Sequence, residues 1–281
     1  MLKKIIEIET KVVFKLLKAM LIKEFGLNVI DDDDNYIFYQ SNLNPICLVA
    51  HIDTVRKGGR VELEQTNNII RNKKGVLGAD DRAGVYGILE LLYRCKAEGV
   101  PYPSVLFTNY EESGGVGVGC FIDDCQHLNP FKTTTLFIEL DRGNSNQYVY
   151  YSWMLPEEIK DYVESFGFVG ACGTYSDVAD LTDFFCIPAV NLSVGFYKQH
   201  TKKERLHIDE LNLTINRVFK MLKNPVEQLY PMENDYIFDE LQEEYINEGL
   251  YIEGWDYFGD EDFESEHQNN RSAKQISKYS I

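Results

Sequence analysis

The chain has 281 residues, of which 44% are hydrophobic, and its formal net charge is −17 at pH 7. This length is enough for one large core, or for one core with an appendage. The sequence has no basic stripe, so we expect no nucleic-acid partner. No apolar run approaches 18 residues and the N-terminus lacks the pattern of a signal peptide, so we expect no membrane span and a cytoplasmic location.

The N-terminal region predicts a helix followed by a short strand. Between residues 8 and 25, apolar pairs alternate with lysines at the spacing of an amphipathic helix, and Gly26 predicts its end. The run Asp31–Asp34 predicts a solvated acidic turn. Tyr36–Tyr39 predicts a strand.

The next elements alternate between strand and helix patterns. Val61–Glu64 and Ile69–Ile70 flank Asn67–Asn68, which is typical of a β-hairpin. Apolar positions between residues 83 and 92 predict a second helix. Residues 156–166 predict a third, with a proline in its first turn. Because strands alternate with helices, the sequence predicts an α/β layer structure.

Four apolar runs each end at side chains that can bind a metal. The runs are residues 46–50, 104–108, 135–140 and 189–196. The side chains that follow them are His51, Asp53, Glu111, Glu112, Asp141 and His200. Short β-rich apolar runs predict buried strands, and ligands of open α/β sheets bind beyond the carboxyl ends of the strands. We therefore expect a divalent-metal site at one sheet edge.

A fifth segment, Gly78–Gly84, opens a helix with the pair Asp80–Asp81. Each acidic residue or histidine has an ordinary explanation when taken alone. A single histidine after a strand is usually structural, paired glutamates in a loop are usually solvated, and aspartates before a helix usually cap it. Their joint recurrence at strand and helix ends favours the metal site.

Most of the acidity lies in the C-terminal segment. From Pro225 onward there are 15 acidic and 3 basic residues, a net charge of −12, which leaves −5 for the first 224 residues. Residues 236–246 predict an acidic amphipathic helix, and the chain from Trp255 onward has the composition of a disordered segment. We expect a catalytic domain over residues 1–224 and an acidic tail over residues 225–281.

The six cysteines are scattered along the chain, so we expect them to be reduced, buried, small hydrophobic residues. Cys120 and Cys125 have no second cysteine pair or nearby histidine, so we expect no metal between them.

Taken together, these motifs resemble the co-catalytic di-zinc exopeptidases, the family that includes peptidase T and leucyl aminopeptidases. The resemblance covers about residues 1–220. The matching motifs are His51–Val55, Gly78–Gly84, Glu111–Gly115, Asp141 and His200–Glu204. The resemblance implies the zinc-peptidase (phosphorylase/hydrolase-like) fold, with a mixed, mostly parallel central sheet and helices on both faces.

The resemblance also implies a set of metal ligands for two Zn²⁺ ions, with Co²⁺ or Mn²⁺ as alternatives. Asp80 would bridge the two ions. His51 and Asp141 would complete one site, and Glu112 and His200 the other. Each ion would then have three protein ligands and an open position for water, as catalytic zinc requires.

Two further acids have implied roles outside the ligand set. Glu111 would act as the general base on the water between the metals. Asp53 would hydrogen-bond the far ring nitrogen of His51 and fix its tautomer. The resemblance also implies a cis peptide bond between Asp80 and Asp81.

Three further details bear on the match. His207 is a rival to His200 as the last ligand, although His200 directly follows an apolar run and has the Thr-x-x-Glu continuation. Only 58 residues separate Asp141 from His200, so the lid or dimerisation domain that peptidase T inserts there is absent. Gly173–Asp177 matches a turn near the substrate pocket of this family, with a plain turn as the alternative.

The predicted function is a zinc-dependent exopeptidase that hydrolyses short peptides, most simply an aminopeptidase. The alternatives are a carboxypeptidase, amide hydrolase or acyl-amino-acid deacylase with the same metal pair, and a non-catalytic binding module on this fold. The oligomeric state stays open.

Overall fold

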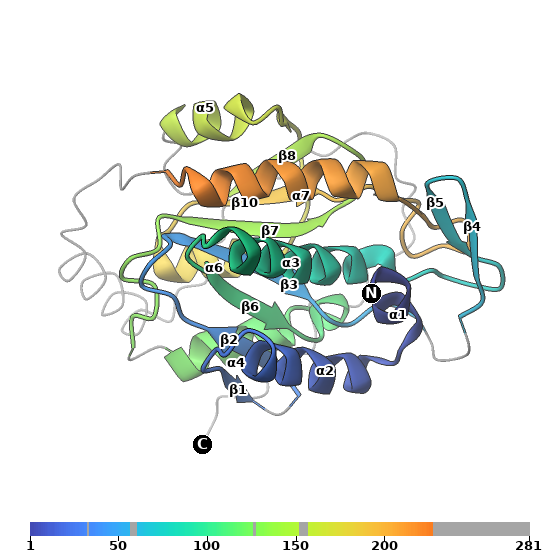
Figure 1. Cartoon of the computed structure of the whole chain (residues 1–281), viewed down its shortest axis with the longest axis horizontal. Coiled ribbons are helices and arrows are strands. Elements are labelled where there is room, and N and C mark those ends of the chain that lie inside the picture. Colours follow the sequence, from blue (N-terminus) through green and yellow to red (C-terminus); the bar gives the residue numbers. More distant parts are fainter. Residues whose placement is uncertain (33, 57–60, 126–127, 152–156, 227–281) are drawn as a thin grey trace, which may run out of the picture. The chain divides into compact units, whose positions relative to one another are not determined.

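The computed structural model describes residues 1–32, 34–56, 61–125, 128–151 and 157–226 (Figure 1). None of the described helices is long and apolar enough to cross a membrane. The helices are α1 (Leu2–Glu7), α2 (Thr10–Lys23), α3 (Ala79–Glu98), the short 3₁₀ helix η1 (Glu111–Ser113), α4 (Val116–Cys125), α5 (Glu157–Ser165), α6 (Asp177–Phe185) and α7 (Ile208–Lys223).

Strands β1 (Ile30–Asp32), β2 (Tyr36–Tyr39), β3 (Ile46–His51), β6 (Ser104–Thr108), β7 (Leu136–Arg142), β8 (Gln147–Tyr151), β9 (Val169–Gly170) and β10 (Ala189–Ser193) form an eight-stranded sheet. Its order is β1-β2-β6-β3-β7-β10-β8-β9. The four central strands β6, β3, β7 and β10 are parallel, so their carboxyl ends lie at one edge. A second, antiparallel sheet has the order β11-β12-β5-β4, from Phe196–Tyr197, Arg205–His207, Ile69–Asn72 and Leu63–Thr66.

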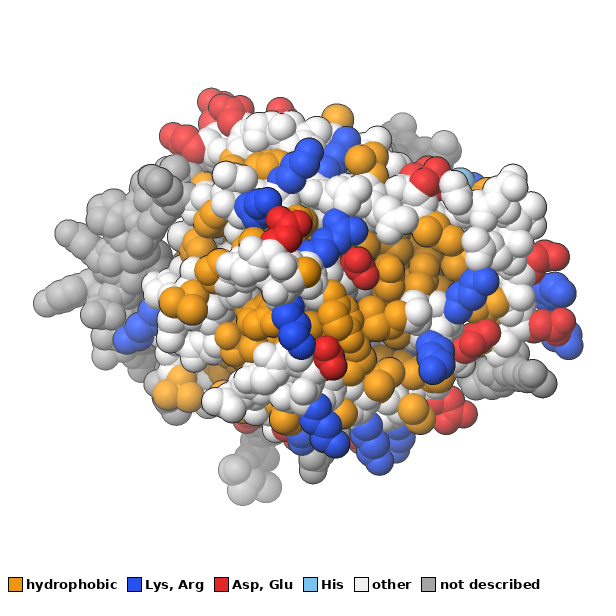
Figure 2. All heavy atoms as spheres, in the orientation of Figure 1, with side chains coloured by type: hydrophobic (Ala, Val, Ile, Leu, Met, Phe, Trp, Pro, Cys, Tyr) orange, Lys and Arg blue, Asp and Glu red, His pale blue; other side chains and the backbone are white. Residues whose placement is uncertain are grey.

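Helices cover both faces of the large sheet, and alternate residues of each central strand face opposite layers. In β3, Leu48 and Ala50 belong to a core cluster with α1, α2, α3 and α7, whereas Cys47 and Val49 belong to a cluster with α4 and α6. Figure 1 shows α2, α3 and α7 in front of the sheet and α6 behind it. Figure 2 shows the front face, where lysine and arginine side chains are interspersed with acidic and apolar ones. The predicted fold class is confirmed.

The helix predicted between residues 8 and 25 corresponds to α2. A helix that the sequence interpretation did not predict, α1, precedes it, and the two are separated by extended backbone at Ile8 (φ −83°, ψ 156°). Two arginines, the half-buried Arg56 and the fully buried Arg82, bind backbone carbonyls at this break. Arg56 donates to the carbonyls of Ile6 and Ile8 at 2.7 and 3.2 Å. Arg82 donates to the carbonyl of Ile5 at 2.8 Å and to the hydroxyl of Thr10 at 3.1 Å.

Three other expectations need correction. The apolar run 189–196 is divided between β10 and β11 of different sheets, with Gly195 (φ +84°) at the turn. Asp31 and Asp32 are in strand β1 rather than in a turn, because they pair with β2. The cysteines are all free, but Cys172 and Cys186 are exposed rather than buried.

The hairpin prediction is confirmed, since β4 and β5 pair around Asn67, which has φ +53°. The predicted third helix corresponds to α5. The last described helix, α7, ends at Lys223. The helix and the disorder predicted beyond residue 226 lie outside the described residues.

Candidate metal centre

The carboxyl ends of β3, β6 and β7 bring most of the predicted site residues to one edge of the large sheet. His51 is the last residue of β3 and is fully buried. Its Nδ1 lies 3.2 Å from Oδ1 of Asp53. Its Nε2, the other ring nitrogen, faces three further carboxylates, those of Asp80, Asp141 and Glu111, at 3.2, 3.5 and 3.9 Å.

Asp80 lies in the first turn of α3 and faces both predicted histidine ligands. Its Oδ1 is 3.2 Å from Nε2 of His51, and its Oδ2 is 3.1 Å from Nε2 of His200. The peptide bond between Asp80 and Asp81 is cis, as the resemblance implied. The helix packs closely on β7 at Gly84, where a Cβ atom would lie 2.0 Å from the carbonyl oxygen of Leu140. Glycine at this position therefore lets the start of α3 approach Asp141.

His200 and Glu112 form the second half of the arrangement. His200 follows β11 in a left-handed conformation (φ +62°), and 48% of its side chain is exposed. Its Nε2 lies 3.0 Å from Oε1 of Glu112, which is in η1 after the end of β6. The rival, His207, lies at the end of β12 and contacts Glu210 at 3.3 Å and Arg205 at 3.3 Å instead.

The electrostatic balance of this cluster demands positive charge. Burial alone would lower the pKa of His51, but the charge of Asp141 and hydrogen bonds to the surrounding carboxylates raise it well above its ordinary value. Hydrogen bonds to Asp80 and Glu112 raise the pKa of His200 to about 10. Burial and the charge of Asp80 raise the pKa of Asp141 well above its usual range. The carboxylates thus need either protons or a cation near them.

The donor set fits a pair of divalent cations. Oδ1 of Asp141 and Oε1 of Glu112 are buried without a hydrogen-bond partner, although an imidazole nitrogen is close to each. Around tetrahedral zinc with bonds of about 2.0–2.1 Å, neighbouring ligand atoms lie roughly 3.3 Å apart. The four imidazole–carboxylate separations, 3.0 to 3.5 Å, match that spacing. Carboxylate and imidazole ligands suit zinc, cobalt or manganese.

Glu111 lies beside these donors, but its carboxylate is 3.9 Å from Nε2 of His51, farther than the carboxylates of Asp80 and Asp141. The carboxylate of Asp53 accepts the backbone N–H groups of Glu111 and Glu112 at 3.1 and 3.2 Å, which fixes η1 next to His51. Burial raises the pKa of Glu111 to about 7, against the opposing charge of His51 and with support from Asp177. A carboxyl with this pKa can accept a proton near neutral pH.

Asp81 is an additional carboxylate close to His51 and Asp141. Its Oδ2 accepts the N–H of His51 at 3.3 Å, and its Oδ1 accepts the N–H of Gly84 at 3.0 Å. Because both oxygens bind backbone groups, we assign Asp81 to holding β3 and α3 together rather than to the ligand set.

The sequence interpretation missed a polar network next to Asp141, formed by Glu139, Ser176 and Asn191. Glu139 is fully buried in β7 and accepts the hydroxyl hydrogen of Ser176. The amide of Asn191 donates to Ser176 at 2.9 Å, and its carbonyl accepts the N–H of Asp141 at 3.0 Å. The available signal was a polar residue inside each of two apolar strands, at positions 139 and 191.

The predicted turn Gly173–Asp177 leads into α6. Asp177 is fully buried and accepts the hydroxyl hydrogen of Thr108 at the end of β6. The turn therefore contacts the same strand that precedes Glu111. His127 and His267 lie outside the described residues.

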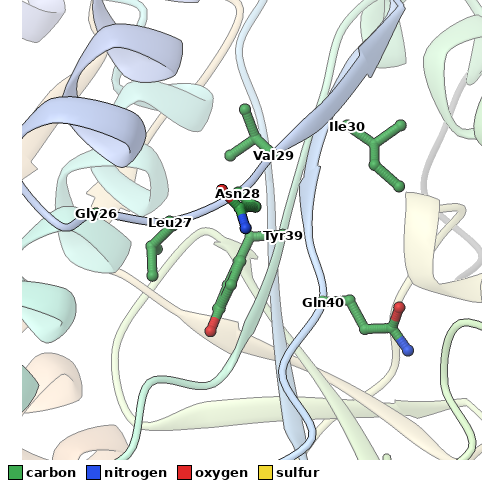
Figure 3. A pocket seen from close by; sticks show the side chains of 7 residues that line it. All are labelled: Gly26, Leu27, Asn28, Val29, Ile30, Tyr39 and Gln40. Atoms are coloured by element: carbon green, nitrogen blue, oxygen red, sulfur yellow. The ribbon is translucent and has the colours of Figure 1, made fainter.

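A separate cavity of about 440 Å³ lies between the end of α2 and strands β1 and β2 (Figure 3). Figure 3 shows its lining residues, Gly26, Leu27, Asn28, Val29, Ile30, Tyr39 and Gln40. The lining contains no histidine, cysteine or carboxylate. It offers none of the side chains that the metal centre requires.

The model of peptidase family M28 matches residues 37–182, which is more than half of the chain. No curated protein matches at a significant level.

Solved structures share the fold at low sequence identity. The aminopeptidase PepT of Bacillus cereus is 16% identical over 79% of this chain and 96% of its own, with a TM-score of 0.62. A tripeptidase of Staphylococcus aureus is 17% identical with the same coverages and a TM-score of 0.64. A TET aminopeptidase from a marine sediment archaeon of the Thaumarchaeota is 11% identical over 84% of this chain and 98% of its own, with a TM-score of 0.60.

Proposed function

We infer that this chain, which belongs to peptidase family M28 and is a peptide-bond hydrolase of a metal-dependent family, is a zinc-dependent exopeptidase of short peptides. The observation that carries the proposal is the arrangement around Asp80. Its two carboxylate oxygens face different imidazoles at 3.2 and 3.1 Å, and each imidazole faces one further carboxylate. A bridging carboxylate between two such sets is the donor pattern of a metal pair.

In this proposal, His51 and Asp141 would hold one zinc ion and Glu112 and His200 would hold the other, with Asp80 shared. Zinc bound there would supply a Lewis acid for the scissile carbonyl and would lower the pKa of a bound water. We propose residues 1–224 as the catalytic domain, because all these side chains lie within it.

The protein's own acid–base group is Glu111. Its carboxylate accepts a proton from the attacking water and delivers it to the leaving amine, which keeps the proton balance within one turnover. Its raised pKa, about 7, suits both steps near neutral pH. Asp53 acts through His51 and η1, because its carboxylate contacts the imidazole and both glutamate N–H groups.

We favour an aminopeptidase over a carboxypeptidase or deacylase because the site is rich in carboxylates. A free α-amino group is a cation at neutral pH, so a carboxylate outside the ligand set, such as that of Glu111, attracts it and repels a free carboxylate. The non-catalytic binding module that the sequence left open disagrees with the family match. Intact Glu111 and the complete ligand set argue against it.

Metal analysis coupled to a hydrolysis assay tests the proposal. Two equivalents of zinc per chain are expected, and exhaustive chelation should abolish hydrolysis. Added Zn²⁺, Co²⁺ or Mn²⁺ should restore it. Full activity after chelation would exclude the metal mechanism, and a chain that binds no metal and cuts no peptide would support the binding module.

A further inference from the structure

The carboxylate of Glu204 accepts hydrogen bonds from four consecutive backbone N–H groups at the start of α3. Its Oε2 accepts the N–H groups of Leu77 and Gly78 at 2.8 and 2.9 Å. Its Oε1 accepts those of Ala79 and Asp80 at 2.8 and 3.2 Å. Only 1% of Glu204 is exposed. All of these bonds join segments more than 120 positions apart in the sequence.

These contacts suit an ionised carboxylate. Burial raises the pKa of Glu204, and the N–H donors of Gly78, Asp80 and Ala79 oppose that effect. Each oxygen already accepts two N–H bonds, so a proton on either would have to displace one of them. Hydrogen bonds to a charged acceptor are also about twice as strong as neutral ones.

The segment that Glu204 binds, residues 77–80, ends at Asp80, whose carboxylate faces both imidazoles. Ordinary capping would stabilise a regular first turn, but Asp80 (φ −76°, ψ 105°) and Asp81 (φ −114°, ψ 39°) are not helical. The irregular backbone here places the two oxygens of Asp80 toward His51 and His200. Because helical propensity does not specify this path, a side chain from elsewhere must hold it.

Glu204 also belongs to the same short segment as His200. Its own N–H donates to the carbonyl of Thr201 at 3.1 Å, and the hydroxyl of Thr201 donates to the carbonyl of Lys198 at 2.7 Å. One compact turn therefore supplies both a histidine at the centre and the anchor for Asp80. A shift of this turn would move both groups together.

We propose that Glu204 is a positioning residue that sets the shared carboxylate of Asp80 between His51 and His200. The inference rests on the proposed function. Glu204 then affects metal affinity and turnover only by holding the backbone of residues 77–80.

Glu204→Gln tests the inference, because it keeps the side-chain size but presents an amide NH₂ to N–H donors. In the metal-free chain, hydrogen exchange at the amides of residues 77–80 should become faster than in the unchanged protein. Zinc affinity should fall by roughly 10–100-fold, the range for partners that orient metal ligands. At saturating zinc, kcat should fall with little change in KM, because Glu204 contacts no peptide.

Two more variants make the test decisive. Glu204→Asp keeps the charge but withdraws it by one methylene, so it should give intermediate exchange and intermediate zinc affinity. Glu210→Gln is the control, since Glu210 contacts Tyr197 and His207 rather than α3. It should leave all three measurements unchanged.

The outcomes separate this inference from the proposed function. If the unchanged protein binds zinc and Glu204→Gln binds it equally tightly, the inference is wrong even if the amides exchange faster. If the unchanged protein binds no zinc and cuts no peptide, the proposed function fails and takes the inference with it. Weaker zinc binding together with faster exchange confined to residues 77–80 supports the inference.

Discussion

The Nδ1 atom of His51 lies 3.2 Å from Oδ1 of Asp53, while the two oxygens of that same carboxylate accept the N–H groups of Glu111 and Glu112. One side chain at the end of β3 thus orients an imidazole and fixes the loop that follows β6. Hydrogen bonding to Nδ1 leaves Nε2 directed at Asp80 and Asp141.

Asp53→Asn should weaken this arrangement without unfolding the protein. An asparagine amide can donate to His51 or accept from it, so the imidazole tautomer is no longer fixed. We expect metal affinity or kcat to fall by about 10–100-fold, the usual effect of losing a partner of a metal-bound histidine. Isothermal titration with zinc and steady-state kinetics measure the two effects, and wild-type values in both would remove Asp53 from the site.

Glu111→Gln should retain the metals and the fold but lose kcat by roughly 10²–10⁴-fold, the scale of general acid–base catalysis. Glutamine has the same size but cannot accept the proton. Glu157→Gln on the exposed first turn of α5 is the matched control and should behave as wild type. Near-wild-type turnover in Glu111→Gln would mean that another group is the base.

The pH profile of the unchanged enzyme should reflect the same residue. The base must be ionised, and burial raises the pKa of Glu111 from 4.5 to about 7. Activity should therefore rise with pH through a limb between these two values, because bound cations oppose the effect of burial. A kcat profile that is flat from pH 4.5 to 7 would contradict the assignment.

The buried arginine after the metal loop should matter for stability. Arg82 is fully buried, and burial lowers its pKa to about 9. Arg82 is a charged donor to the carbonyls of Ile5 and Ile8, so Arg82→Met should cost about 1.5–3 kcal/mol in unfolding free energy for each lost hydrogen bond that water does not replace. Arg94→Met on the same helix removes a half-exposed pair with Glu90 and an exposed hydrogen bond to Asn216, and should cost under about 1 kcal/mol. Equal denaturant midpoints for the two variants would contradict this role.

Sequence patterns predicted the parts of the fold that depend on local periodicity. The strands ending near His51, Glu111 and Asp141 follow from short apolar runs, and the position of α3 follows from its apolar repeat. Their convergence also followed, because carboxyl ends of parallel strands share an edge. The preference for His200 over His207 agrees with the separation of His200 from Asp80, 3.1 Å.

Features that depend on tertiary contacts were not predictable from these patterns. Helix α1 lies before the apolar pattern of residues 8–25. The extended backbone at Ile8 that separates the two helices is held by hydrogen bonds from Arg56 and Arg82, which come from distant segments. The contact between Glu204 and α3 joins distant segments, so no local pattern contains it. The role of Glu139 was not predicted because the run around it is apolar enough to be interpreted as an ordinary buried strand.

Recognition of the peptide end depends on what lies between Asp141 and His200. The described residues there include β8, β9 and β10 of the main sheet, β11 of the second sheet, and helices α5 and α6. Most of these elements complete the main sheet and the helices that pack on it. They leave little chain for a lid that would hold a peptide's free carboxylate.

We therefore expect amino acids to be released from the N-terminus of short peptides. The carboxylate of Glu111, half-buried beside the metal ligands, can attract the α-ammonium group and place the first peptide bond at the metals. Hydrogen bonds to charged groups contribute about 1.5–3 kcal/mol, and 1.4 kcal/mol is tenfold. N-acetylation should thus lower kcat/KM by roughly 10–100-fold, whereas C-terminal amidation should leave it within about twofold. Competition assays on one tripeptide in its free, acetylated and amidated forms, read by mass spectrometry, measure both ratios. Faster cleavage of the acetylated form would instead identify a carboxypeptidase or deacylase, because only those enzymes gain from a neutral N-terminus at this acidic site.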